Sequence, residues 1–102
     1  MEITGEELFK KIENGEKIIV DFWASWCGPC KLYKPIFEKI AETKEVQMYT
    51  MNVENNTDFA VKMGIRTVPT TKIFDKGGET FSKSGLIFEE ELKSMVKNLI
   101  NG

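Results

Sequence analysis

The segment Lys17–Trp23, which reads KIIVDFW, restricts most strongly how this chain can fold. It is nearly continuously apolar and rich in β-branched and aromatic residues. A strand of this kind is covered on both faces, whereas a half-exposed strand alternates apolar and polar side chains. The chain has 102 residues, a length that suits one domain with a single modest core. We therefore predict one domain, residues 1–102, in which a sheet is covered on both sides.

The remaining segments supply the helices and strands of such an α/β fold. Apolar residues at helical spacing predict helices, and β-rich runs between turn signals predict strands. The turn Asp75-Lys76-Gly77-Gly78 separates two of these runs and predicts a hairpin. The predicted helices are 6–12, 31–43, 59–63 and 89–100, and the predicted strands are 1–4, 17–23, 46–53, 70–74 and 80–84, of which the first is very short. This order predicts a central mixed β-sheet with helices on both faces.

Composition and charge exclude several classes of function. Hydrophobic residues make up 41% of the chain and charged residues 29%, with a net charge of -2, as in ordinary globular domains. No basic cluster indicates nucleic acid or an anionic membrane surface, and no apolar stretch approaches the ~20 residues of a membrane span. The acidic start Met1–Glu7 lacks the apolar core of a signal peptide. We therefore expect a cytoplasmic monomer that binds neither nucleic acid nor membranes.

The chain contains 2 Cys and 0 His. Without histidine, the Ser–His and Cys–His pairs of many nucleophilic enzymes cannot form. Two thiols cannot complete the four-ligand shell of a structural zinc site, so we expect no metal and no cofactor beyond the cysteine pair itself. A close pair of cysteines in a cytoplasmic chain favours redox cycling. A structural disulfide, or a buried pair of thiols, is the alternative that spacing alone leaves open.

Cys27 and Cys30 lie at the junction between the buried strand and the helix that follows it. Residues at this spacing in a first helical turn are roughly 5–6 Å apart, which a disulfide can span. Cys27 is predicted at the helix N-terminus, where unpaired N–H groups and the helix dipole favour a thiolate. Cys30 lies one turn further in, and we expect it to be less accessible. Cys27 is therefore predicted to be the nucleophile and Cys30 the resolving cysteine. Gly28 and Pro29 would leave room for the approaching sulfur.

The stretch Val20–Lys31, VDFWASWCGPCK, resembles the active-site motif of the thioredoxin family. A second stretch, Gly64–Thr70 (GIRTVPT), together with Pro35 and Gly85, extends the resemblance over almost the whole chain. The resemblance implies a thioredoxin fold with five strands and four helices. It also implies a protein-disulfide reductase of electron transport and cell redox homeostasis, with disulfide-containing protein substrates and a thioredoxin reductase as partners.

The resemblance implies roles for further residues. Pro69 matches the family's cis-proline beside the cysteines, although on the residues alone it would be an ordinary trans proline. The Val68 backbone would bind an extended substrate segment. Asp21 matches a carboxylate buried beneath the cysteines, and in so apolar a run desolvation should raise its pKa and let it accept the proton of Cys30; the alternative is an exposed aspartate at a strand end. We assign Trp23 to the core. The substrate-binding surface would consist of Trp26, Gly28, Pro29, Val53, Val68, Pro69 and Gly85.

The sequence departs from the family pattern beside Asp21. Thioredoxins usually place a lysine near this aspartate, and Thr50 occupies the matching position here. Lys72 is the candidate replacement as charge partner of Asp21, because its strand is expected beside that of Asp21. The alternative is that the Lys72 ammonium simply reaches solvent from the sheet.

The residues therefore predict a thiol–disulfide oxidoreductase that reduces disulfides in other proteins through Cys27 and Cys30. Two alternatives stay open. Lys72 would suit an isomerase-like or specialised redox donor. A thioredoxin-like binding subunit with non-essential thiols would use the same surface without the chemistry.

Overall fold

The computed structural model describes the whole chain, from Met1 to Gly102. Its helices and strands follow the predicted order, with boundaries that differ from the prediction by up to three residues. The elements are α1 (Gly5–Glu13), β1 (Ile18–Trp23), α2 (Gly28–Ala41), β2 (Gln47–Asn52), the 3-10 turn η1 (Val53–Asn55), α3 (Thr57–Lys62), β3 (Thr70–Asp75), β4 (Gly78–Ser84) and α4 (Glu89–Asn101).

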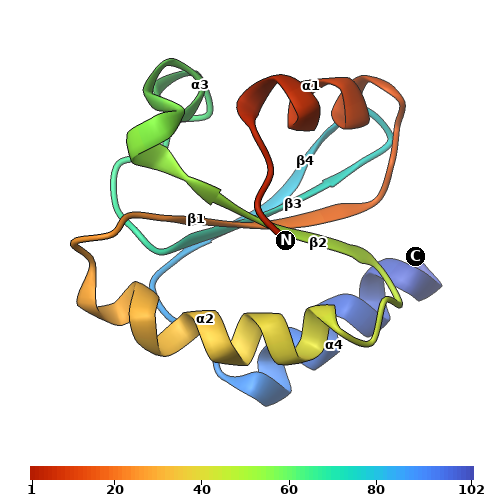
Figure 1. Ribbon diagram of the computed structural model, residues 1–102. Coiled ribbons are helices and arrows are strands. Elements are labelled where there is room, and N and C mark those ends of the chain that lie inside the picture. Colours follow the sequence, from red (N-terminus) through yellow and green to blue (C-terminus); the bar gives the residue numbers. More distant parts are fainter.

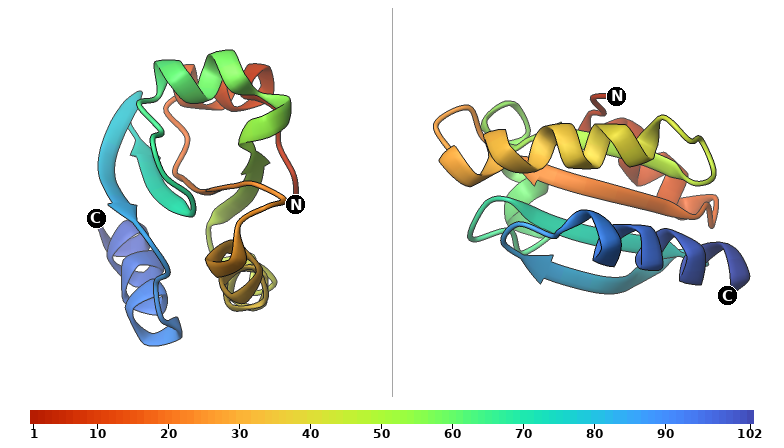
Figure 2. Two further views of the ribbon diagram at one scale, coloured as in Figure 1. Left: turned by 90° about the vertical axis from the view of Figure 1, so that its left-hand side faces the viewer. Right: turned by 90° about the horizontal axis from the view of Figure 1, so that it is seen from below.

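The four strands form one mixed sheet in the order β2-β1-β3-β4. β1 runs parallel to β2 and antiparallel to β3, and β4 is antiparallel to β3. Helices α1 and α3 cover one face of the sheet, and α2 and α4 cover the other (Figure 1). Figure 2 shows the sheet between these two helical layers. The predicted mixed sheet with helices on both faces is confirmed.

The N-terminal strand is reduced to a single bridge, so the sheet has four strands and the five implied by the resemblance are wrong. Glu2 bridges Thr50 in a parallel arrangement, and the Ile3 N–H donates to the Thr50 carbonyl at 2.8 Å. α1 begins at Gly5, and Thr4 caps it through a reciprocal pair of hydrogen bonds with Glu7. Because the cap fixes the start of this helix, only the first residues are left to pair with β2.

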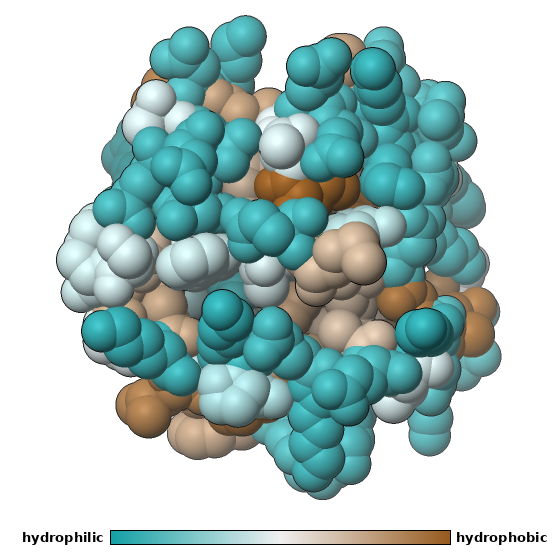
Figure 3. All heavy atoms as spheres, viewed as in Figure 1, coloured by the Kyte–Doolittle hydropathy of each residue, from teal (hydrophilic) through white to brown (hydrophobic).

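β1 is buried on both faces, as its composition predicts. Every residue of Ile18–Phe22 is at most 1% exposed. Alternate side chains along a strand point to opposite faces, so Ile19 packs with α2 and α4 while Ile18, Val20 and Phe22 pack toward α1 and α3. The Kyte–Doolittle surface in Figure 3 is mostly hydrophilic on the face shown, with apolar atoms between the charged ones. None of the helices has the length and apolarity needed to cross a membrane.

We expect Phe37→Ala to destabilise the protein by about 3–5 kcal/mol, because Phe37 is 1% exposed and packs edge-on against Tyr33 within the core beneath α2. The matched control on the same helix is Leu32→Ala, at 68% exposure, which should change stability by less than about 0.5 kcal/mol. Urea unfolding of both variants measures the difference. Equal losses would contradict the packing described for α2.

Candidate functional site

Cys27 and Cys30 form a disulfide at the N-terminus of α2, with their Cα atoms 5.3 Å apart. Cys27 is the N-cap residue of the helix, and its Sγ accepts a hydrogen bond from the Cys30 N–H at 3.1 Å. Pro29 occupies the first turn, where its missing N–H leaves no bond unmade. The sulfur of Cys27 therefore takes the place that a serine or aspartate oxygen has in many helix caps, a position that favours negative charge.

The two cysteines are equally buried in the disulfide form, each 3% exposed. The expectation that Cys30 would be the less accessible of the two is therefore wrong for this state. Both residues pack in one small cluster with Ala24, against half-buried Val53 and Val68. What distinguishes the cysteines is the cap: the Cys27 sulfur accepts a backbone N–H, whereas the Cys30 sulfur does not.

The segment around Pro69 lies against the disulfide. The Val68–Pro69 peptide bond is cis, the isomer that the resemblance implies, and Pro69 is buried. The Cys27 Sγ lies 3.5 Å from the Val68 carbonyl oxygen. Gly85 donates its N–H to the Pro69 carbonyl at 2.7 Å and has φ +93, a conformation that favours glycine. The loop before β3 thus lies against the cysteines, and Gly85 holds that loop from the end of β4.

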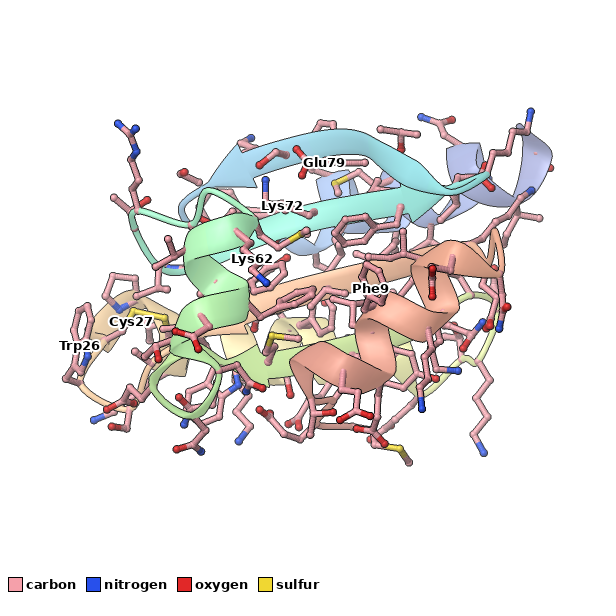
Figure 4. All side chains as sticks on the ribbon, turned by 90° about the horizontal axis from the view of Figure 1, so that it is seen from above. Phe9, Trp26, Cys27, Lys62, Lys72 and Glu79 are labelled. Carbon is pink, nitrogen blue, oxygen red and sulfur yellow. A yellow bond between two sulfur atoms is a disulfide. The ribbon has the colours of Figure 1, made fainter.

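The surface beside the disulfide is open and partly apolar. Trp26 is 72% exposed, next to Cys27 at one end of the molecule (Figure 4). Gly28 has open space where a side chain would lie, and Gly28 and Pro29 are both exposed. The surface next to the disulfide is therefore exposed at Trp26, Gly28 and Pro29, although the cysteines themselves are buried.

Trp23 is half-buried and packs against the cluster of Ala24, Cys27 and Cys30, so it lies at the edge of the core and not in its interior. Its indole Nε1–H donates to Glu2 at 3.1 Å, and the Lys34 ammonium lies 5.3 Å from the ring centroid. As the last residue of β1, it sits where the sheet meets solvent.

Glu54 fixes the loop that carries the cysteines, which sequence reasoning missed. Its carboxylate accepts the Ser25 N–H at 2.6 Å, and its own N–H donates to the Asn52 side chain at 2.7 Å. No local signal in the sequence links Glu54 to Ser25, because the contact requires β1 and β2 to lie side by side.

Asp21 is buried in β1 on the face covered by α2 and is only 1% exposed. Burial raises its pKa to about 7; the Glu2 carboxylate acts in the same direction, as Glu38 does, and Lys34 opposes them. Its Oδ1 is the one buried side-chain nitrogen or oxygen without a hydrogen-bond partner. A carboxyl with such a pKa exchanges its proton near neutrality, where thiol chemistry takes place.

Lys72 does not pair with Asp21, so the expected replacement of the missing lysine is wrong. In the β1–β3 register Lys72 faces Val20, whereas Asp21 faces Thr71, and successive residues of a strand point to opposite faces. The Lys72 ammonium lies 2.9 Å from Glu79 and donates to Ser82 at 3.1 Å (Figure 4). Its side chain is 7% exposed, so the alternative of a solvated ammonium is wrong as well.

The position that usually carries the lysine binds an acid here. Thr50 donates its hydroxyl to Glu2 at 2.7 Å, and Glu2 also accepts the Asn52 N–H and the Trp23 indole N–H. Glu2, Lys34 and Glu38 are therefore the charged neighbours of Asp21 that sequence reasoning missed. Lys34 lies one helical turn after Cys30, a spacing visible in the sequence, whereas Glu2 reaches the site only through the bridge to β2.

No group of three or more His, Cys, Asp or Glu side chains is placed to hold a metal ion.

Comparisons with known proteins place the chain among thioredoxins. Residues 1–98 match the family model described as Thioredoxin. A curated thioredoxin of Malassezia sympodialis is 42% identical over 74% of this chain and 75% of its own length. One of Mycoplasma genitalium is 38% identical over 91% of this chain and 89% of its own.

Solved structures agree. Fasciola hepatica thioredoxin superposes with a TM-score of 0.84 at 33% identity, covering 96% of this chain and 98% of its own. A mutant thioredoxin from Halobacterium salinarum superposes with a TM-score of 0.88 at 30% identity, covering 98% of this chain and 89% of its own.

The raised pKa of Asp21 makes stability depend on pH. The folded protein keeps this proton up to about pH 7, whereas the unfolded chain loses it near the ordinary value of 3.8. The folded state therefore binds more protons between these values, and this contribution to stability is lost as the pH rises through about 7. We expect Asp21→Asn to be more stable than the parent at about pH 8, by on the order of 4 kcal/mol.

Urea unfolding of the oxidised protein over a pH series measures this, and the difference should shrink toward zero below about pH 4. Asp58→Asn, at an exposed position of α3, is the control and should show no such pH-dependent gain. Equal stability of Asp21→Asn and the parent at the alkaline end would contradict the burial of the charge.

Proposed function

Because the chain belongs to the thioredoxin family and is a thiol–disulfide oxidoreductase that reduces protein disulfides, we propose that Cys27 is its nucleophile and Cys30 its resolving cysteine. The observation that supports this most directly is the cap of α2. The Cys27 sulfur accepts the Cys30 N–H at the positive end of the helix, where a thiolate is favoured over a thiol.

The first step is attack on the substrate. The Cys27 thiolate attacks one sulfur of a substrate disulfide, that disulfide breaks, and a mixed disulfide between Cys27 and the substrate forms. The second substrate sulfur leaves as a thiolate and takes up a proton. The number of disulfide bonds is unchanged, because the mixed disulfide has replaced the substrate disulfide.

The second step releases the substrate. Asp21 accepts the proton of Cys30, through a water, and the resulting thiolate attacks the Cys27 sulfur. The mixed disulfide breaks, the Cys27–Cys30 disulfide forms, and the substrate leaves as a dithiol. Two electrons have then passed from the cysteine pair to the substrate. Asp21 suits this role because its pKa of about 7 leaves it partly ionised at neutral pH.

The substrate binds across the surface around Cys27. An extended segment would lie along the Val68 backbone, as in strand addition, beside exposed Trp26. The groups that support this are Gly28, Pro29, Val53, Val68, Pro69 and Gly85. Gly85 and Pro69 hold the segment in place through their 2.7 Å hydrogen bond.

The proposal extends to the setting in which the protein works. We propose one thioredoxin domain, residues 1–102, acting as a monomer in the cytoplasm, with a thioredoxin reductase that restores the dithiol for further electron transport. The mixed charge of -2 and the absence of a basic cluster from the sequence support a partner set without nucleic acid or membranes.

Nothing in the site favours the two alternative functions. Lys72 was the residue that suited an isomerase-like donor, and it lies on the opposite face of the sheet from Asp21. A binding subunit with idle thiols would not need a sulfur at the helix cap.

Cys27→Ser should reduce the rate of insulin-disulfide reduction by dithiothreitol to that without protein, because the attacking sulfur is gone. Cys30→Ser should instead accumulate a mixed disulfide between Cys27 and an insulin chain, seen by mass spectrometry, because nothing resolves it. The exposed Ser94→Ala on α4 is the control. Full activity of the Cys27→Ser, Cys30→Ser double variant would support the binding subunit and reject the mechanism.

Asp21→Asn should slow the resolving step by about 100-fold, the lower end of what a positioned general base contributes. The measurement is stopped-flow release of a chromophoric thiol from a mixed disulfide on Cys27. Between about pH 6 and 8 the parent rate should follow the ionisation of Asp21, and that dependence should disappear in the variant. Asp58→Asn should behave as the parent. An unchanged rate in Asp21→Asn would remove Asp21 from the mechanism.

A further inference from the structure

A pair of hydroxyl groups is buried beneath α2, next to the strand that carries Asp21. Tyr33 on α2 and Thr71 on β3 are both 0% exposed, and their hydroxyl oxygens are 2.8 Å apart. Neither hydroxyl has another hydrogen-bond partner in the protein. Two polar groups in so dry a place are costly unless all their protons are used.

Thr71 lies directly opposite Asp21 in the antiparallel pairing of β1 with β3. Side chains of such opposed residues point to the same face, with Cβ atoms about 4.5–5.5 Å apart. The buried Asp21 Oδ1 accepts no hydrogen bond. This unpaired acceptor therefore lies next to the hydroxyl groups of Tyr33 and Thr71.

The number of hydroxyl protons available links the Tyr33–Thr71 pair to the Asp21 carboxyl. Each hydroxyl carries one proton and can also accept, so the contact between Tyr33 and Thr71 uses one proton and leaves the other unspent. The other threonine beside Asp21, Thr50, cannot supply a proton because its hydroxyl donates to Glu2. If Tyr33 donates its proton to the Thr71 oxygen, the Thr71 hydroxyl still has its own proton. Thr71 is then the residue next to Asp21 that can donate a hydrogen bond.

We propose that Tyr33 donates to Thr71 and that Thr71 in turn donates to the Asp21 carboxylate through one water. Thr71 and Tyr33 are then positioning residues that orient the carboxyl toward the cysteines and stabilise its ionised form. The chain uses neutral donors at a site where thioredoxins usually have a lysine. Tyr33 and Thr71 affect turnover only if Asp21 has the role in catalysis proposed above.

The charged groups around Asp21 come from the other elements packed on this face. Glu2, from the N-terminal segment, and Glu38, from α2, disfavour its ionisation, and Lys34, also from α2, favours it. Burial raises the pKa of Tyr33, the hydrogen bond with Thr71 opposes this, and the charges of Asp21 and of Glu91 on α4 raise it further. Tyr33 therefore stays protonated and remains able to donate. With two acids and one base nearby, a hydroxyl donor is the group that offsets the loss of solvation.

The test is a titration of the Asp21 carboxyl by carbon NMR in the oxidised protein, where the cysteines do not titrate. Thr71→Val removes the hydroxyl and keeps the shape of the side chain. We expect it to raise the pKa of Asp21 by about one pH unit, a tenfold change in its ionisation constant, as for the loss of one hydrogen bond to a charged group. Thr71→Ser keeps the hydroxyl and should restore the parent pKa.

Tyr33→Phe should raise the pKa of Asp21 by less than Thr71→Val does, because Thr71 keeps its own proton. If valine is not accommodated, Thr71→Ala makes the same deletion. A pKa of Asp21 that is unchanged or lowered when the Thr71 hydroxyl is removed would overturn the proposal. So would a serine variant that titrates like the valine variant.

The readout also separates this proposal from the proposed function. The titration reports the hydrogen bond whether or not Asp21 takes part in catalysis, whereas the rate of the Asp21→Asn variant reports catalysis alone. In the Asp21→Asn background, Thr71→Val should leave the pH profile of the resolving step unchanged. A further change in that profile would show that Thr71 does not act through Asp21, and would overturn the proposal.

Discussion

The burial of β1 between two helical layers is the constraint on which the site depends. Ile18, Val20 and Phe22 are fixed against α1 and α3, and Ile19 against α2 and α4, so the strand can neither shift its register nor turn over without exposing apolar surface. Asp21 is held in the same strand and is carried into a dry environment that raises its pKa. The end of the strand also sets where α2 begins, and with it the cap formed by Cys27. The raised pKa of Asp21 and the position of Cys27 thus have the same structural cause, the burial of β1.

The surroundings of the disulfide come from segments that are far apart in the sequence. The Val68 carbonyl and the cis-Pro69 bond reach the sulfurs from the loop before β3, and Glu54 holds the loop before Cys27 from the end of β2. Gly85, after β4, closes the arrangement on Pro69. The Gly85–Pro69 contact is a backbone hydrogen bond, and the Glu54 contact joins a carboxylate to the Ser25 N–H. These contacts connect the loops around the disulfide to the ends of the strands, which holds the reacting sulfurs in a defined position.

Asp21 shows how neighbouring residues can compensate for a missing partner. Asp21 has two acidic neighbours, Glu2 and Glu38, and one cation, Lys34, so hydrogen bonds are needed to stabilise its ionised form in a buried position. The sheet brings Thr71 opposite it on one side and Thr50 on the other, and the two threonines differ because Thr50 is committed to Glu2. Lys72 was the residue expected to help, and it failed for a simple reason: a strand alternates its faces, so a lysine next to Thr71 in sequence points away from Asp21. Its charge is instead neutralised by Glu79.

The sequence by itself determined the mixed α/β architecture, the cysteine pair at a strand–helix junction and the burial of Asp21, because these follow from local patterns: hydrophobic periodicity, the helix start and the apolar run around the acid. It did not determine the loss of the first strand, the half-exposed place of Trp23, the equal burial of Cys27 and Cys30, or the neighbours of Asp21. Those depend on which strands lie side by side, in which register, and on which face each side chain emerges. Only the tertiary structure decided them, because the pairing of distant segments cannot be recognised from the residues of either segment alone.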